Sequence, residues 1–213
     1  MAFDKSACLS YKYIICICRN VIFDFSQSEK GVSMPAGAIA NTLGQLVGQQ
    51  FLWQPGQQAL LNQCLTIGPI QPPSYAFSCY ELPFYGARMA YTLLESIERV
   101  LDGCGAVMAG RPPNPRSFVG GMRSYNNYGI WKYIWAQNTP VAGDFVFFSA
   151  NGVTYDAHVA IATGNGYDTI SFGHDGVGNV QAAQALLVQR MTVDQIFAVN
   201  PGLRSAHFLT PNW

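Results

Sequence analysis

The sequence predicts an α+β domain in which helices come first and an antiparallel β-sheet follows. Two observations support this prediction. In the first half of the chain, apolar residues recur at helical spacing, most clearly from residue 79 to about residue 101. After Pro140, short runs rich in Val, Ile and Phe alternate with turns that contain Gly, Asn or Asp. Such runs are typical of strands joined by tight turns.

The composition is that of a globular protein, with 49% hydrophobic and 11% charged residues. A chain of 213 residues is long enough for one well-cored domain, with or without an N-terminal extension. Twelve basic residues balance twelve acidic ones, and neither sign forms a long run. Because nucleic-acid binding normally leaves a basic footprint, we expect no nucleic-acid partner.

No apolar stretch reaches the roughly 18–20 residues that a membrane helix needs. The closest, residues 11–25, contains Lys12, Arg19 and Asp24, and its composition favours a buried strand. The first nine residues do not resemble a secretory signal peptide. We therefore expect a protein without a transmembrane segment, made in the cytoplasm and exported by a signal-independent secretion system.

The N-terminal third is predicted to contain two helices, within residues 31–48 and 57–65. Glycine–proline and proline–proline pairs in residues 68–73 then break the chain. We expect residues 1–73 to form a flanking segment that packs on a core of residues 74–213.

A third helix is predicted to begin at Cys79. Ser78 suits the N-cap position, and Glu81 three residues later completes a capping-box pattern. Pro83 is tolerated because it falls near the first turn. Gly103 supplies a stop signal after the last apolar position.

A cysteine at the start of a helix is a candidate nucleophile. The helix N-terminus carries roughly half a positive charge, and a neighbouring histidine can lower a cysteine pKa to about 3.5–7.5. We therefore expect Cys79 to attack a carbonyl group, with its own N–H helping to hold the oxyanion. The alternative is a structural cysteine, since cysteines are often fully buried. Cys104 follows a helix stop signal and Cys64 lies inside a helical pattern, so both are weaker candidates.

The spacing of the cysteines and histidines predicts no bound metal. The cysteines occupy positions 8, 16, 18, 64, 79 and 104. They show no repeated Cys-x-x-Cys spacing, and the three histidines show no zinc-finger spacing. Without a signal peptide, reduced thiols are expected rather than a disulfide framework. We therefore expect neither a metal nor another cofactor.

His158 opens a short apolar strand and is the candidate base. A period of two places His158 on the same face as Ala160 and Ala162. Val159 and Ile161 then lie on the opposite face. His158 is thus expected to point away from the larger aliphatic side chains, into a site or to solvent. A structural histidine with satisfied hydrogen bonds is the alternative.

A third polar group is expected to orient the imidazole. A hairpin after His158 would return the chain past it and bring His174 or Asp175 close. Either side chain could accept the imidazole proton and fix the tautomer. Asp168 is a weaker candidate because aspartates in turns usually bind the backbone. The choice among His174, Asp175 and Asp168 stays open at this point.

Three segments together resemble the NlpC-like and CHAP cysteine peptidases. They are residues 78–81 leading into an apolar helix, residues 140–148 with a Gly143-Asp144 turn that leads into an aromatic strand, and residues 158–164 with a His-Val-x-Ile strand. In these families a nucleophilic cysteine begins a helix that packs on an antiparallel sheet. The resemblance covers roughly residues 74–175 and implies a papain-like fold. It also implies Cys79 as nucleophile, His158 as base and His174 as the third catalytic residue.

The resemblance implies an amide hydrolase that works through an acyl-enzyme, mainly on peptidoglycan stem peptides. The expected function is therefore a peptidoglycan-degrading amidase or endopeptidase toxin delivered by a secretion system, with an immunity protein as a further partner. One alternative is a deamidase, protease or acyltransferase that acts on host molecules with the same Cys–His site. Another is a non-catalytic binding module that has kept the fold.

Overall fold

The structure is a computed structural model in which the chain divides into Met1–Val32 and Ser33–Trp213. Only the second unit contains described residues. They are residues 36–54, 59–70, 73–90, 92–108, 129–131, 139–151, 153–154, 157–173 and 183–213. The strand predicted for residues 11–25 lies outside them.

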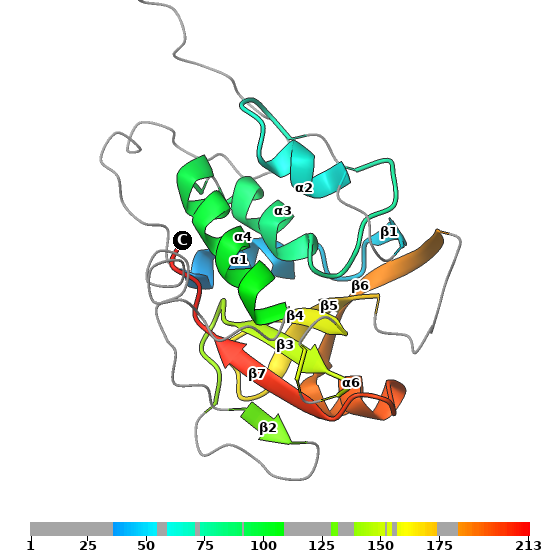
Figure 1. The fold of residues 1–213 in the computed structure, drawn as a ribbon. Coiled ribbons are helices and arrows are strands. Elements are labelled where there is room, and N and C mark those ends of the chain that lie inside the picture. Colours follow the sequence, from blue (N-terminus) through cyan, green and yellow to red (C-terminus); the bar gives the residue numbers. More distant parts are fainter. Residues whose placement is uncertain are drawn as a thin grey trace, which may run out of the picture. The chain divides into compact units, whose positions relative to one another are not determined.

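The described strands form one sheet in the order β1-β6-β5-β4-β3-β7-β2, and each neighbouring pair is antiparallel (Figure 1). The strands are β1 (Gln50–Trp53), β2 (Gly129–Trp131), β3 (Phe145–Ser149), β4 (His158–Ala162), β5 (Asp168–Phe172), β6 (Gln184–Thr192) and β7 (Ser205–Leu209). The strands that follow Pro140 supply the centre of the sheet, as the sequence predicts.

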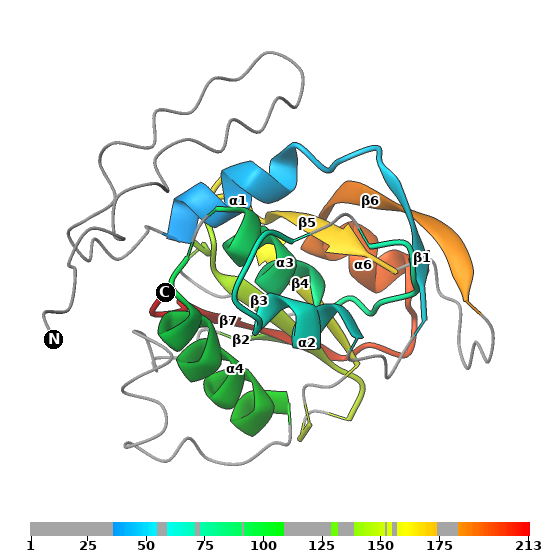
Figure 2. The same ribbon diagram turned by 90° about the horizontal axis from the view of Figure 1, so that it is seen from above.

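Most of the described helices cover one face of this sheet, and α6 lies against the other (Figures 1 and 2). The helices are α1 (Ala36–Gly44), α2 (Ala59–Cys64), α3 (Leu82–Met89), α4 (Leu94–Met108) and α6 (Val193–Val199). This arrangement confirms the predicted α+β class with helices packed on an antiparallel sheet.

The sheet carries a hydrophobic core on each face, and β3 contributes to both. Phe145 and Phe147 pack among the helices, whereas Val146 and Phe148 pack against α6. Because both faces are covered, this strand is a continuous apolar run rather than an alternating one. Burying a side chain of phenylalanine size contributes roughly 1.5–3 kcal/mol.

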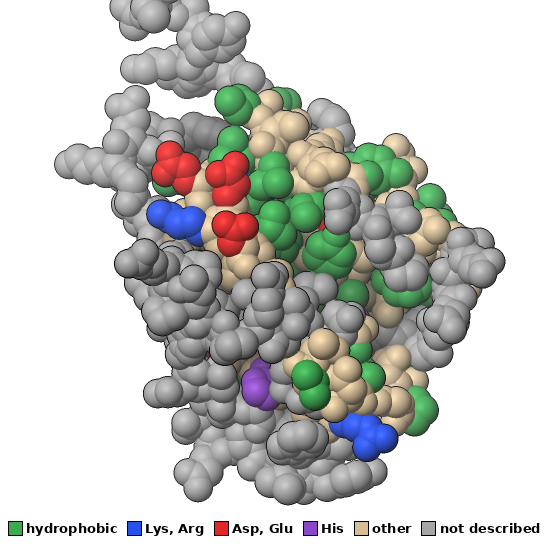
Figure 3. Space-filling model, viewed as in Figure 1, with side chains coloured by type: hydrophobic (Ala, Val, Ile, Leu, Met, Phe, Trp, Pro, Cys, Tyr) green, Lys and Arg blue, Asp and Glu red, His purple; other side chains and the backbone are tan. Residues whose placement is uncertain are grey.

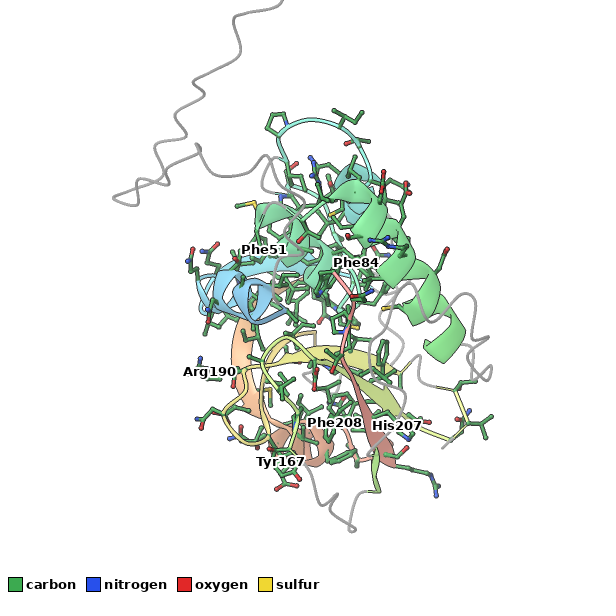
Figure 4. All side chains as sticks on the ribbon, turned by 90° about the vertical axis from the view of Figure 1, so that its left-hand side faces the viewer. Phe51, Phe84, Tyr167, Arg190, His207 and Phe208 are labelled. Atoms are coloured by element: carbon green, nitrogen blue, oxygen red, sulfur yellow. The ribbon has the colours of Figure 1, made fainter. Side chains whose placement is uncertain are left out.

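Rings on the two faces show the same division. In Figure 4, Phe84 of α3 lies among the helices, while Tyr167 and Phe208 lie on the other side of the sheet. The rings of Tyr167 and Phe208 pack with centroids 5.9 Å apart. The acidic side chains in Figure 3 gather over α4, whose Glu95, Glu98 and Asp102 are exposed. The opposite side of α4 carries the apolar residues that enter the core.

Elements that precede the predicted boundary at residue 73 belong to the same sheet and core. β1 pairs with β6, and α1 packs closely on α3. At this helix crossing, a Cβ on Gly86 would come within 2.5 Å of the Leu43 side chain. A glycine is therefore needed on α3 where α1 crosses it.

The single helix predicted from residue 79 to residue 101 is wrong, because the chain forms two helices there. The first, α3, ends near Ala90, and the N–H of Thr92 closes it by bonding to the Ala87 carbonyl at 3.0 Å. Such a wide turn is typical of a helix C-terminus. The second helix, α4, continues past the predicted stop at Gly103 to Met108. The break lets Ile97 and other apolar residues of α4 face the core independently of α3.

The predicted Gly-Asp turn ties the start of β3 to two distant segments. Gly143 has a φ of 86°, and a Cβ at this position would collide with the Ala36 carbonyl. Asp144 is fully buried and accepts hydrogen bonds from the Val141 N–H at 2.9 Å and the Thr210 hydroxyl at 2.6 Å. The turn therefore fixes α1 and the C-terminal segment against the same strand.

Candidate active site

The segment that leads to Cys79 is held between β1 and β5. The N–H of Phe77 donates to the Leu52 carbonyl at 3.0 Å, and the N–H of Gln54 donates to the Phe77 carbonyl at 3.1 Å. The Phe77 ring stacks on Phe172 of β5 with centroids 4.6 Å apart. Two residues before Cys79, the chain is thus fixed by both backbone and side chain.

Residues 78–81 form a turn before α3, closed by a bond from the Glu81 N–H to the Ser78 carbonyl at 3.2 Å. The predicted capping box is half present, because a Glu81 carboxylate oxygen accepts the Ser78 N–H at 2.7 Å. The Ser78 hydroxyl donates to the same carboxylate at 3.0 Å instead of capping the helix. The helix begins at Leu82, with Pro83 in its first turn. The prediction that Cys79 is the first helical residue is therefore wrong.

The sulfur of Cys79 accepts hydrogen bonds from three backbone N–H groups, those of Val159, Tyr80 and Cys79 itself. These bonds favour the thiolate, but burial has the larger effect and raises the pKa of the Cys79 thiol to about 11. The sequence led us to expect a lowered pKa. The difference arises because the thiol is packed between the turn and the sheet, where charge is poorly solvated.

His158 is 4% exposed and lies on the α6 side of the sheet. Its Nε2 lies 2.7 Å from the Ser171 Oγ, a hydrogen bond whose donor depends on the tautomer. Its ring lies 5.5 Å from that of Phe148, which packs on α6. Ala160 and Ala162 belong to the same core. The predicted alternation along this strand is thus confirmed, but the imidazole is buried against the core beside α6 and does not point to solvent.

The turn and the strand meet at Val159. This residue follows His158, its side chain packs in the core beneath the helices, and its N–H reaches the Cys79 sulfur. Cys79 therefore lies against the first residues of β4, although it is 79 positions from His158 in the sequence. The strand pleat directs the imidazole towards Ser171, on the other face, so the structure does not bring the imidazole to the Cys79 sulfur.

The candidates for the third group differ in where the structure places them. His174 and Asp175 lie outside the described residues. Asp168 lies at the far end of β5, five residues from the position opposite His158, which is about 16 Å along the strand at roughly 3.3 Å per residue. Its carboxylate accepts the Asn165 side-chain amide at 3.3 Å, so it serves the turn.

Ser171 is the partner of His158 that sequence reasoning missed. It is fully buried in β5, where the pattern alone gives an apolar strand. A signal was nevertheless present, because the hairpin register places Ser171 opposite Ala160 and therefore on the face of His158. A polar residue at that place in an otherwise apolar strand indicates a buried partner.

Among the described cysteines, only Cys79 is partly exposed. Cys64 and Cys104 lie in helices and are buried. Burial raises the pKa of the Cys64 thiol to about 12 and that of Cys104 further. Both thiols are therefore expected to be unreactive. This agrees with the prediction that they are weaker candidates for the nucleophile than Cys79.

The described residues contain no group of three His, Cys, Asp or Glu side chains that could hold a metal ion. Among the helices described, none is both long and apolar enough to cross a membrane. Comparison with protein-family models, with curated proteins and with solved structures finds no match.

Proposed function

We propose that the protein is a cysteine-dependent amide hydrolase with a papain-like fold, related to the NlpC-like and CHAP peptidases. The observation that carries this proposal is the hydrogen bond from the Val159 N–H to the Cys79 sulfur. It places the candidate nucleophile beside the residue that follows the candidate base. The half-buried state of Cys79, unlike Cys64 and Cys104, also supports the choice of nucleophile.

In the proposed reaction, His158 takes the thiol proton while the sulfur of Cys79 attacks the carbonyl carbon. The tetrahedral intermediate expels the amine, which receives the proton from the imidazolium, and a thioester remains. Water then attacks the thioester with His158 again as base, and the acid product and the free thiol are released. In the structure Nε2 lies 2.7 Å from the Ser171 Oγ on the α6 side of the sheet, so this reaction requires the imidazole to leave Ser171 and turn towards Cys79.

The raised pKa of Cys79 defines how this reaction must start. With a pKa of about 11, roughly one molecule in ten thousand carries a thiolate at pH 7. The resting enzyme therefore holds a neutral thiol. Proton transfer to His158 must accompany attack on the substrate, which is general-base catalysis rather than use of a preformed ion pair.

The proposed substrate is peptidoglycan, with the cell-wall stem peptide as acceptor of the attack and secretion as the route of delivery. The support for this substrate is the resemblance of the Cys79, Gly-Asp-aromatic and His-Val-x-Ile segments to peptidoglycan-cleaving families. The proposal also includes a partner, an immunity protein that binds this protein in the producing cell.

The test is incubation of purified peptidoglycan with wild type, Cys79→Ala and Cys104→Ala, followed by mass spectrometry of released muropeptides. Wild type and Cys104→Ala should release muropeptides, and Cys79→Ala should release none. Release of muropeptides by folded Cys79→Ala at the wild-type rate would refute the assignment. Release of ammonia from glutamine side chains without backbone cleavage would instead identify a deamidase.

A non-catalytic binding module is the second candidate, and the raised pKa of Cys79 favours it. Such a module would bind insoluble peptidoglycan equally well as wild type and as Cys79→Ala, with no product from either. Co-sedimentation of both proteins with peptidoglycan, measured beside muropeptide release, separates the two candidates.

A further inference from the structure

Glu81 is a fully buried carboxylate in the turn that carries Cys79. One oxygen accepts the Leu61 N–H of α2 at 3.1 Å, and Leu60 of the same helix also donates a backbone bond. The other oxygen accepts the N–H and the hydroxyl of Ser78, at 2.7 and 3.0 Å. Each of these donors is neutral, so the carboxylate is well bonded but its charge is not cancelled.

Burying a carboxylate costs free energy unless the group is paired with an opposite charge and hydrogen-bonded. A purely structural link between the turn and α2 could use a neutral side chain. Burial is the largest influence on Glu81 and raises its pKa, whereas the bonds from Ser78 and α2 lower it. The fold therefore places a buried carboxyl group, bonded only by neutral donors, two residues from the only half-buried thiol among the described residues.

We propose that Glu81 is a positioning residue for Cys79: its carboxylate fixes the 78–81 turn to α2 and imposes a negative charge on the thiol. The effect on catalysis rests on the proposed function. The effect on the chemistry of the thiol does not, because it follows from the turn alone.

Several other ionisable groups lie around the Glu81 carboxylate, but the carboxylate is the main charge near Cys79. They are Tyr80 in the turn, Tyr75 before it, Cys64 of α2, Arg88 of α3 and, beside Val159, His158 of β4. Burial is the largest influence on the pKa of Cys79, Tyr80 and Cys64, and the Glu81 charge raises each of these pKa values further, whereas the Arg88 charge lowers that of Cys64. The Arg88 guanidinium donates to the carbonyls of a separate loop, at 3.1 and 2.9 Å.

The consequence is a nucleophile that stays protonated until a base removes its proton. Coulomb repulsion between a thiolate and the carboxylate disfavours charge on the sulfur in the resting protein. When the sulfur attacks a carbonyl, its charge passes to the substrate oxygen and this repulsion falls. The Glu81 charge thus raises the free energy of the resting thiolate more than it raises that of the transition state.

The experiment measures the pH dependence of iodoacetamide alkylation at Cys79, followed peptide by peptide with mass spectrometry. Wild type is compared with Glu81→Gln and with Glu95→Gln, which removes an exposed carboxylate from α4. Glu81→Gln should move the midpoint for Cys79 down by about 1 pH unit. Glu95→Gln should leave it unchanged. An unchanged midpoint in folded Glu81→Gln would overturn the proposal.

Two further variants guard against loss of the fold in Glu81→Gln, with circular dichroism reporting the fold of each. Glu81→Asp keeps the charge and should keep the wild-type midpoint. Ser78→Ala removes one donor, leaves the charge and should keep or raise the midpoint. A lower midpoint in either variant would show that turn geometry, not charge, controls the thiol, and would overturn the proposal.

The alkylation result for Glu81 does not depend on which substrate the protein acts on. If the midpoint moves as expected and no variant releases muropeptides, the inference about Glu81 stands and the proposed hydrolase fails. If wild type is active and the midpoint does not move, the hydrolase stands and the role of Glu81 fails.

Discussion

The backbone N–H of Val159 donates a hydrogen bond to the sulfur of Cys79. This bond joins the turn before α3 to the first residues of β4. It also ties the thiol to a strand that is buried on both faces, so the position of the sulfur depends on the core rather than on a surface loop. The hydrogen bond between His158 and Ser171 lies on the other face of the same strand.

Ser171→Ala should lower kcat on peptidoglycan about 10-fold, because the imidazole loses the partner that orients it. The matched control is Thr169→Val, which removes another buried hydroxyl of β5. That hydroxyl donates to the Met191 carbonyl at 2.7 Å and does not bind His158. Urea unfolding of both variants checks that they lose similar stability. Equal kcat values for two such variants would show that Ser171 acts only on stability.

Gly86→Ala should destabilise the protein by about 1–3 kcal/mol, because the added methyl group overpacks against Leu43. Gly105→Ala in α4 is the control, since a Cβ there meets nothing within 4 Å. That change should stabilise the protein by about 0.5–1 kcal/mol through helix propensity. Urea denaturation of both variants measures whether the free energy of unfolding falls for Gly86→Ala and rises for Gly105→Ala. A stabilising Gly86→Ala would mean that α1 and α3 are not in close contact.

His207 should make stability depend on pH, because burial lowers its pKa below the ordinary value. Below about pH 6.5 the unfolded chain binds a proton at this residue that the folded protein resists. The contribution of His207 is therefore fully present above that pH and is lost as the pH falls through the lowered value. The free energy of unfolding of wild type, minus that of His207→Gln, should decrease from pH 7 to pH 5. A constant difference would contradict the pKa shift.

Local patterns predicted those parts of the site that depend on neighbouring residues. The alternation around His158 needs only the period of a strand, and the Gly143 turn needs only its own backbone, so both are confirmed. The predicted helix failed because apolar spacing continues smoothly through the break near Ala90. Spacing records which side chains face the core, whereas the break depends on how α3 and α4 each pack on it.

The electrostatics of the site could not be read from spacing. A thiol near a histidine suggests a low pKa, but burial of Cys79 decides the direction, and burial is a property of the assembled fold. Ser171 was missed for a similar reason, since its role appears only when β4 and β5 are in register. The positions of His174 and Asp175 stay predictions.

The three N–H groups around the Cys79 sulfur have a consequence for the timing of the proposed reaction. At rest they solvate the sulfur. During attack, electron density leaves the sulfur as it builds on the carbonyl oxygen, and donors held by the turn at Cys79 and Tyr80 can serve the new charge with little movement. In the proposed reaction, the same backbone N–H groups would then stabilise first the sulfur and afterwards the oxyanion.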